Sequence, residues 1–139
     1  MAYSGRFIPD NPKKYLGNPT NIIYRSLWER RVMVHLDKNI NVLEWSSEEV
    51  VIPYLSPVDN RYHRYFPDFF VRTKTDALLL EVKPHSQSIE PTKRSKVTKK
   101  YLQEVMTYGV NQAKWKAAEE YCLDRKWKFR VITEKDLGI

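Results

Sequence analysis

Two apolar stretches in the middle of the chain carry charged side chains. The first is Phe66-Pro67-Asp68-Phe69, and the second is Ala77-Leu78-Leu79-Leu80-Glu81-Val82-Lys83. The second stretch is almost continuously apolar, which predicts a strand buried on both faces. Residues 63–72 are rich in aromatic side chains and predict a neighbouring strand that Pro67 interrupts. The polar residues 73–76 predict a hairpin turn between the two strands.

This hairpin places three charged side chains together. Glu81 and Lys83 point to one face of their strand, because side chains alternate across a strand. Asp68 lies on the paired strand, thirteen residues before Glu81 in the sequence. Two carboxylates at such close range repel each other unless a cation lies between them. A small number of hard oxygen ligands suits Mg²⁺, with Mn²⁺ as a substitute, so we predict Asp68 and Glu81 as metal ligands.

Lys83 is predicted to act at the same site. Its amino group would orient or deprotonate an attacking water, or in its protonated form stabilise charge that develops on phosphoryl oxygens. A structural alternative stays open, in which Asp68 caps a turn after Pro67 while Glu81 and Lys83 form a pair on an edge strand. The functional interpretation is favoured because a charged pair at the end of a buried strand is costly without a function.

The remaining sequence supplies the other elements of an α/β fold. Residues 1–19 are rich in Pro, Asn, Gly and Lys and predict an irregular arm. A helix that starts near Pro19 and Thr20 and ends near Asn39 is predicted from the four-residue spacing of Tyr24, Trp28, Val32 and Leu36. The other predicted elements are strands at 41–45 and 49–54 joined by a tight turn, a basic loop at 84–97, a helix at 98–125 kinked or divided at Gly109, and a last strand at 127–133. We expect residues 1–139 to form a single domain with one mixed sheet flanked by helices, in the order α-β-β-β-β-α-β.

Glu29 lies on the first predicted helix and supplies a third acid. It shares a helical face with Ile22, Met33 and Leu36, so its carboxylate is set among apolar neighbours, which suits a metal ligand. A local alternative stays open. The segment Ser26-Leu27-Trp28-Glu29 is also a capping box, in which Glu29 would only satisfy a backbone N–H at the start of the helix. The metal-site role is the favoured interpretation.

The charge of the chain favours a polyanionic partner. It has 24 Lys and Arg against 17 Asp and Glu, a net charge of +7. Residues 92–103 contain five basic side chains and no acid. We predict that this stretch faces DNA phosphates together with two arginines that precede Asp68, although a solvated surface loop would have the same composition. The predicted DNA-binding residues are Lys93, Arg94, Lys96, Lys99, Lys100, Arg61 and Arg64.

The composition excludes several classes of protein. Cys122 is the single cysteine, so no intrachain disulfide forms, and three scattered histidines do not have the spacing of a structural zinc site. The start of the chain has no apolar run like that of a secretory signal. The longest aliphatic stretch, residues 77–80, is far too short to span a bilayer. We therefore expect an intracellular or virion protein without a membrane partner or a small-molecule cofactor.

The charged constellation resembles a known superfamily. Pro67-Asp68, Glu81-Val82-Lys83 and the helix with Glu29 resemble the PD-(D/E)xK nucleases, whose restriction-endonuclease-like core has the order α-β-β-β-α-β. Within this superfamily the chain is similar from end to end to the head completion nucleases of contractile-tailed bacteriophages. The segments that carry the similarity are Met1–Gly5, Ile23–Glu29, Val51–Tyr54, Arg64–Phe66, Glu81–His85 and Ile132–Glu134. A similar arrangement occurs in the endonuclease subunits of heteromeric transposases, which usually add a second DNA-binding domain that this sequence does not show.

The resemblance implies a metal-dependent DNA phosphodiesterase with endonuclease and exonuclease activity, which leaves 5′-phosphate and 3′-hydroxyl ends. It implies Asp68 and Glu81 as metal ligands, Lys83 as the catalytic lysine and Glu29 as an additional acid. It also implies work late in capsid maturation, in the bacterial host cytoplasm or on the virion, with portal, head or neck proteins as partners. Two alternatives stay open: a head completion or neck protein that binds DNA ends or the portal without cutting, and a transposase-type endonuclease subunit.

Overall fold

The computed structural model describes residues 3–93 and 95–138 of the chain. A four-stranded sheet with the strand order β3-β6-β7-β8 forms its centre. The pairs β3–β6 and β6–β7 are antiparallel and β7–β8 is parallel, so the sheet is mixed. Its strands are β3 (Val42–Ser47), β6 (Phe69–Thr73), β7 (Ala77–Val82) and β8 (Lys128–Ile132).

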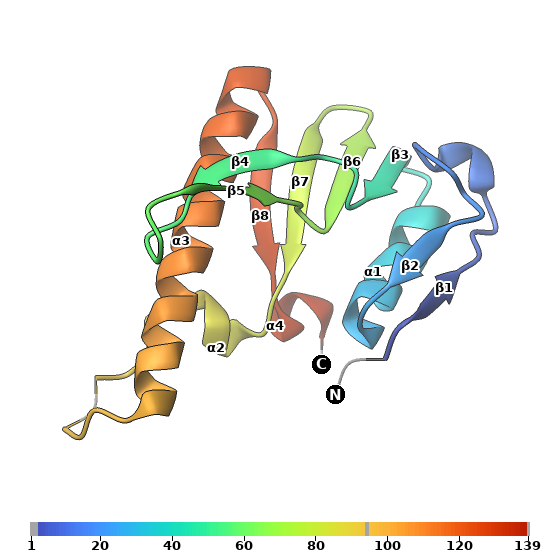
Figure 1. The fold of residues 1–139 in the computed structure, drawn as a ribbon. Helices are drawn as coiled ribbons and strands as arrows, with labels where there is room; N and C mark the ends of the chain where they lie inside the picture. The colour runs from blue at the N-terminus through green and yellow to red at the C-terminus, as the bar shows by residue number, and fades with distance from the viewer. Residues whose placement is uncertain (1–2, 94, 139) are drawn as a thin grey trace.

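Two long helices cover the two faces of this sheet (Figure 1). Helix α1 (Leu27–Lys38) packs on one face and helix α3 (Lys99–Arg125) on the other. The alternation along β6 explains this arrangement, because Phe69 and Val71 pack on the α1 side while Phe70 packs on the α3 side. The predicted fold class, a mixed sheet flanked by helices, is confirmed.

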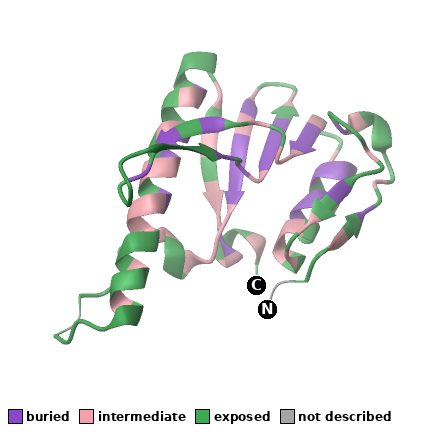
Figure 2. Cartoon of the chain, in the orientation of Figure 1, coloured by how far each residue is buried: buried purple, intermediate pink, exposed green. Residues whose placement is uncertain are grey.

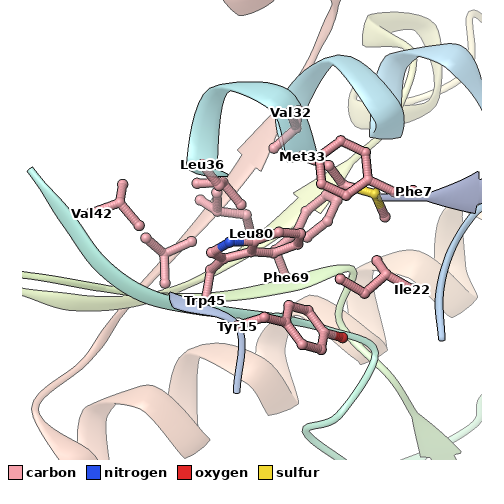
Figure 3. Packing of buried hydrophobic residues seen from close by; sticks show 11 residues of the cluster. Phe7, Tyr15, Ile22, Val32, Met33, Leu36, Val42, Trp45, Phe69 and Leu80 are labelled. Carbon is pink, nitrogen blue, oxygen red and sulfur yellow. The ribbon is translucent and has the colours of Figure 1, made fainter. Parts of the chain in front are cut away.

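The core on the α1 side is built around Trp45, which is fully buried at the centre of its cluster (Figure 3). The rings of Tyr15 and Phe7 meet it edge-on, with centroids 4.8 and 6.0 Å away. Figure 2 shows that buried residues gather on the sheet and on the helix faces that meet it, whereas the first turns of α3 are exposed. That exposed end of α3 extends beyond the sheet.

Two short antiparallel ribbons lie outside the main sheet. Strands β4 (Ile52–Leu55) and β5 (Tyr62–Tyr65) pair with each other and pack on α3. The prediction that a tight turn joins two strands at 41–45 and 49–54 in one sheet is wrong, because β3 pairs with β6 and β4 leaves for the separate ribbon. The chain changes direction at Glu48, whose φ of 54° lies in the left-handed region.

The predicted start of the first helix is also wrong. Strand β2 (Ile22–Tyr24) precedes the helix and pairs with β1 (Gly5–Phe7), and α1 begins only after its cap, Ser26. The cap hydroxyl accepts a hydrogen bond from the Glu29 backbone N–H at 3.2 Å. Helix α3 runs as one unbroken helix through Gly109, where a kink or division was predicted. Two short helices, α2 (His85–Ser88) and α4 (Glu134–Leu137), complete the described chain, and no helix among the described residues is long and apolar enough to cross a membrane.

The N-terminal arm is more ordered than its composition suggests. It contains β1 and a 3-10 turn, η1 (Pro12–Lys14), and it is attached to the end of α1 through the buried carboxylate of Asp37. The backbone N–H groups of Asp10 and Asn11 donate to that carboxylate at 2.8 and 3.1 Å. A buried acceptor that satisfies two main-chain donors is the kind of interaction that sequence periodicity does not reveal.

Replacing Asp37 therefore tests how the arm is held. We expect Asp37→Ala to lower the free energy of unfolding by about 1.5–3 kcal/mol, because two main-chain N–H groups lose their hydrogen bonds to a charged acceptor. Urea denaturation measures this decrease. Asp10→Ala is the matched control, since its exposed carboxylate makes a surface ion pair with Lys38. Equal decreases in the two variants would contradict the assigned role of Asp37.

Candidate active site

The ends of β6 and β7 bring Asp68 and Glu81 together. Phe69 pairs with Leu80, so the residues just before Phe69 and just after Leu80 are neighbours across the hairpin. Oδ2 of Asp68 accepts a hydrogen bond from the Val82 N–H at 2.7 Å, and the Asp68 N–H donates to Oε1 of Glu81 at 3.3 Å. The main chain thus fixes both carboxylates in the arrangement that the sequence predicted.

Both carboxylates lie in a low-dielectric environment. Glu81 is only 5% exposed, and the phenol of Tyr65, itself 3% exposed, lies beside it. Burial raises the pKa of Asp68 well above its usual range, and the charge of Glu81 adds to the effect. Burial also raises the pKa of Glu81, which the charge of Lys83 partly offsets. Two acids held this closely are destabilised as a pair of anions and would be relieved by a cation.

Lys83 follows on the same strand edge. Its Nζ lies 4.0 Å from Oε2 of Glu81, and its side chain is 30% exposed. The Lys83 N–H donates to the carbonyl of Ile132 on β8 at 2.9 Å, which extends the parallel pairing past Val82 and fixes where the side chain leaves the sheet. The ammonium group therefore has access both to the carboxylate pair and to solvent.

Glu29 approaches the pair from α1. Its carboxylate accepts a hydrogen bond from the Ser26 hydroxyl at 3.1 Å, so part of the local capping interpretation applies. It is also partly buried: desolvation raises its pKa, the Ser26 hydrogen bond opposes that shift, and the charge of Glu48 adds to it. The negative charge of Glu29 in turn raises the pKa of Asp68. Glu29 thus lies at the edge of the acidic cluster, while the apolar-face argument fails for Ile22, which belongs to β2.

Sequence reasoning missed two residues of this neighbourhood, Glu48 and Lys114. The Glu48 N–H donates to the Asp68 carbonyl at 3.1 Å, and its carboxylate pairs with Arg25 at 3.2 Å. The predicted tight turn between residues 45 and 49 was the available signal for Glu48. Lys114 lies on α3 within electrostatic range of Glu81, and nothing in the helical pattern distinguishes it from other lysines of that helix.

The predicted DNA-binding residues lie in two places. Arg94 is outside the described residues, and the other four basic side chains of residues 92–103 are exposed before and at the start of α3. Arg61 and Arg64 are exposed at the β4–β5 ribbon, where the Arg64 guanidinium lies 5.9 Å from the ring centroid of Phe66. All six described residues are solvent-accessible, as contacts with a phosphate backbone require.

The donor set at the pair fits a hard divalent cation. The hydrogen bonds between the two strands use Oδ2 of Asp68 and Oε1 of Glu81, which leaves Oδ1 and Oε2 as further acceptors. Among the described residues no group of three or more His, Cys, Asp or Glu side chains is arranged to hold a metal ion by itself. Two carboxylates suit an ion such as Mg²⁺, which keeps several waters and binds substrate phosphate, better than one that needs a complete protein cage.

Comparisons with known proteins agree with the resemblance to nucleases that the sequence motifs carry. Residues 39–134 match the family model described as TnsA-like endonuclease N terminal, a range that contains Asp68, Glu81 and Lys83 but not Glu29. The chain is 39% identical over 142 residues to a protein of Enterobacteria phage T4 named "Head completion nuclease". That similarity covers 99% of this chain and 95% of the phage protein, so it spans the arm and Glu29 as well.

The raised pKa of Asp68 predicts a pH-dependent gain in stability for Asp68→Asn. A carboxyl whose pKa is higher in the folded chain binds more protons there than in the unfolded chain, so its contribution to stability falls as pH rises through that window. We expect Asp68→Asn to be more stable than wild type at pH 8 by about 1–3 kcal/mol and to lose most of this advantage at pH 5.

Urea unfolding in EDTA at the two pH values measures this difference. Asp124→Asn, an exposed aspartate on α3, is the control and should change stability little at either pH. An advantage of Asp68→Asn that is absent at pH 8, or the same at both pH values, would show that the carboxylate pair carries no electrostatic strain.

Proposed function

We propose that this chain, which belongs to the family of TnsA-like endonuclease N-terminal domains, is a metal-dependent DNA nuclease that acts in phage head completion. The observation that carries the nuclease proposal is the buried pair of Asp68 and Glu81 with the Lys83 ammonium 4.0 Å from Glu81. The head completion role is inferred from the phage relative, whose name states it and whose length the chain matches almost completely. DNA and the proteins of the phage head, portal or neck are the proposed partners, and the host cytoplasm or the virion is the proposed location.

The carboxylates of Asp68 and Glu81 are the proposed ligands of Mg²⁺, with Mn²⁺ as a substitute. When bound, the ion would supply Lewis-acid activation of water and neutralise charge on the phosphate. Glu29 is proposed as an additional acid that contacts the same centre, directly or through water. Its half-buried position at the third residue of α1 keeps it within electrostatic range of Asp68.

Lys83 is proposed to act on the nucleophile. Its ammonium group orients the attacking water and stabilises the negative charge that develops on the phosphoryl oxygens. The water oxygen forms a bond to phosphorus and releases one proton to solvent, while the bond from phosphorus to the 3′-oxygen breaks and that oxygen takes up a proton from solvent. The products are a 5′-phosphate and a 3′-hydroxyl. Both endonuclease and exonuclease action are compatible with this chemistry.

Cleavage assays with matched variants test the nuclease proposal. We expect wild type to cut supercoiled and linear DNA in Mg²⁺ and not in EDTA, and we expect Lys83→Ala to lower kcat by about 100-fold or more. Asp68→Ala should be inactive. Lys74→Ala removes an exposed lysine from the turn at the other end of the same hairpin and should cut like wild type.

Two results would contradict this proposal. Cleavage by wild type that persists in EDTA would remove the metal from the mechanism. DNA that stays intact with wild type and Lys83→Ala alike, while both bind it, would instead favour a head completion or neck protein that holds DNA ends without cutting them.

The basic segment before α3 is proposed to bind the DNA backbone. We expect neutralisation of its five basic side chains to weaken DNA binding and to flatten the dependence of log K on log salt, by about one unit for each phosphate that the variant no longer binds. Fluorescence anisotropy with a short duplex over a range of salt concentrations measures the slope. The residues replaced together are Lys93, Arg94, Lys96, Lys99 and Lys100.

A control with neutralised residues elsewhere on the surface separates local interactions from net charge. Neutralising exposed basic residues at the opposite end of α3 and on β8 changes the net charge without changing the proposed interface. We expect this control to keep the wild-type slope, and an unchanged slope in the basic-segment variant would identify that segment as an ordinary solvated loop. The control residues are Arg125, Lys126 and Lys128.

A further inference from the structure

One lysine of α3 differs from its neighbours in burial. Lys99, Lys100 and Lys116 are exposed on this helix, whereas Lys114 is partly buried. Trp115 and Ala118, which follow it, are 7% and 0% exposed and pack into the core beneath the sheet. The helix is therefore firmly seated at this point, so the position of Lys114 is set by the packing of its neighbours.

The ammonium group of Lys114 lies over two tyrosines of the β4–β5 ribbon. Its Nζ is 5.7 Å from the ring centroid of Tyr54 and 5.6 Å from that of Tyr65. Such ring faces attract a cation and hold it in place without neutralising it. Tyr65 connects Lys114 to the carboxylate pair, because its hydroxyl lies beside Glu81, although in the described part of the chain it has no partner in good hydrogen-bonding geometry.

The charged side chains that act on Lys114 are those of the candidate active site. Burial lowers its pKa, the charge of Lys83 lowers it further, and the charges of Glu81 and Asp68 oppose this. Among the ion pairs of the described residues, none joins Lys114 to a carboxylate within 4.0 Å. A cation that has given up much of its hydration without an anionic partner is costly to the folded chain. An anion that enters the site would supply that partner.

We infer that Lys114 is a second lysine of the active site, which binds a non-bridging oxygen of the phosphate that is cleaved. This inference rests on the proposed nuclease function and assigns the anion as a DNA phosphodiester. Lys83 comes from β7 and Lys114 from α3, so two separate elements would hold the same phosphate against the carboxylate pair. The negative charge on the phosphoryl group increases as water attacks, so the contribution of Lys114 is larger in the transition state than in the bound substrate.

The test compares three replacements of lysine on one helix. Lys114→Met keeps the length of the side chain and its packing on the two tyrosines but removes the charge, and Lys114→Arg restores the charge. Lys116→Ala removes an exposed lysine two residues away and is the control. For Lys114→Met we expect kcat in Mg²⁺ to fall by about 100-fold with a much smaller change in KM, with part of kcat regained in Lys114→Arg and an unchanged kcat in Lys116→Ala.

Stability and binding measurements separate the possible causes of a lower kcat in Lys114→Met. We expect the melting temperature of Lys114→Met to equal or exceed that of wild type, because a partly buried charge is removed, so reduced activity would not reflect unfolding. In Ca²⁺, used as a non-catalytic ion, Lys114→Met should bind a short duplex more weakly than Lys116→Ala. Wild-type kcat in Lys114→Met, or equal decreases in Lys114→Met and Lys116→Ala, would overturn the inference.

The two proposals fail in different ways. A wild-type chain that binds duplex DNA but never cuts it would end the nuclease proposal. In that case the Ca²⁺ binding comparison still decides whether Lys114 contacts phosphate, since equal affinities of Lys114→Met and Lys116→Ala would overturn that contact.

Discussion

The hydrogen bonds that join Asp68 to the end of β7 are the constraint on which the site depends. Asp68 uses both its carboxylate and its N–H, binding the Val82 N–H at 2.7 Å and Glu81 Oε1 at 3.3 Å. These interactions force two acids to remain close in a buried environment, which costs free energy in the absence of a cation. The folded chain thus has an unfavourable electrostatic arrangement where the proposed chemistry occurs.

Each layer of the fold places one further charged side chain near the Asp68–Glu81 pair. The sheet supplies Lys83, α1 supplies Glu29, and α3 supplies Lys114, held over the rings of the β4–β5 ribbon. The β4–β5 ribbon therefore shapes the surroundings of the pair, because its Tyr65 fills the space between α3 and Glu81. The N-terminal arm acts at a greater distance, since Asp37 fixes it to the end of the helix that carries Glu29.

The sequence predicts those parts of this arrangement that depend on the periodicity of side chains within one strand or helix. Strand alternation and a polar turn were sufficient to place Asp68, Glu81 and Lys83 together, and burial on both faces identified β7. The pairing of β1 with β2 could not be found this way, because three-residue strands carry too little periodic signal. The position of Lys114 depends on how α3 packs on the separate ribbon, and the one-sheet interpretation of the sequence contained no such ribbon.

The net charge of +7 conceals two opposite local fields. Three acids, Glu29, Asp68 and Glu81, gather where the proposed chemistry needs phosphate to enter, so this region by itself repels DNA. The exposed basic residues before α3 are proposed to attract DNA, but the effect of such charges falls off over about 8 Å at physiological salt. Close to the acids, only charges within the site can offset that repulsion, which is the physical reason for a bound cation and for lysines on two different elements. In the proposed mechanism, the excess of basic residues brings DNA to the protein, and the partly buried Lys83 and Lys114 determine where the phosphate binds.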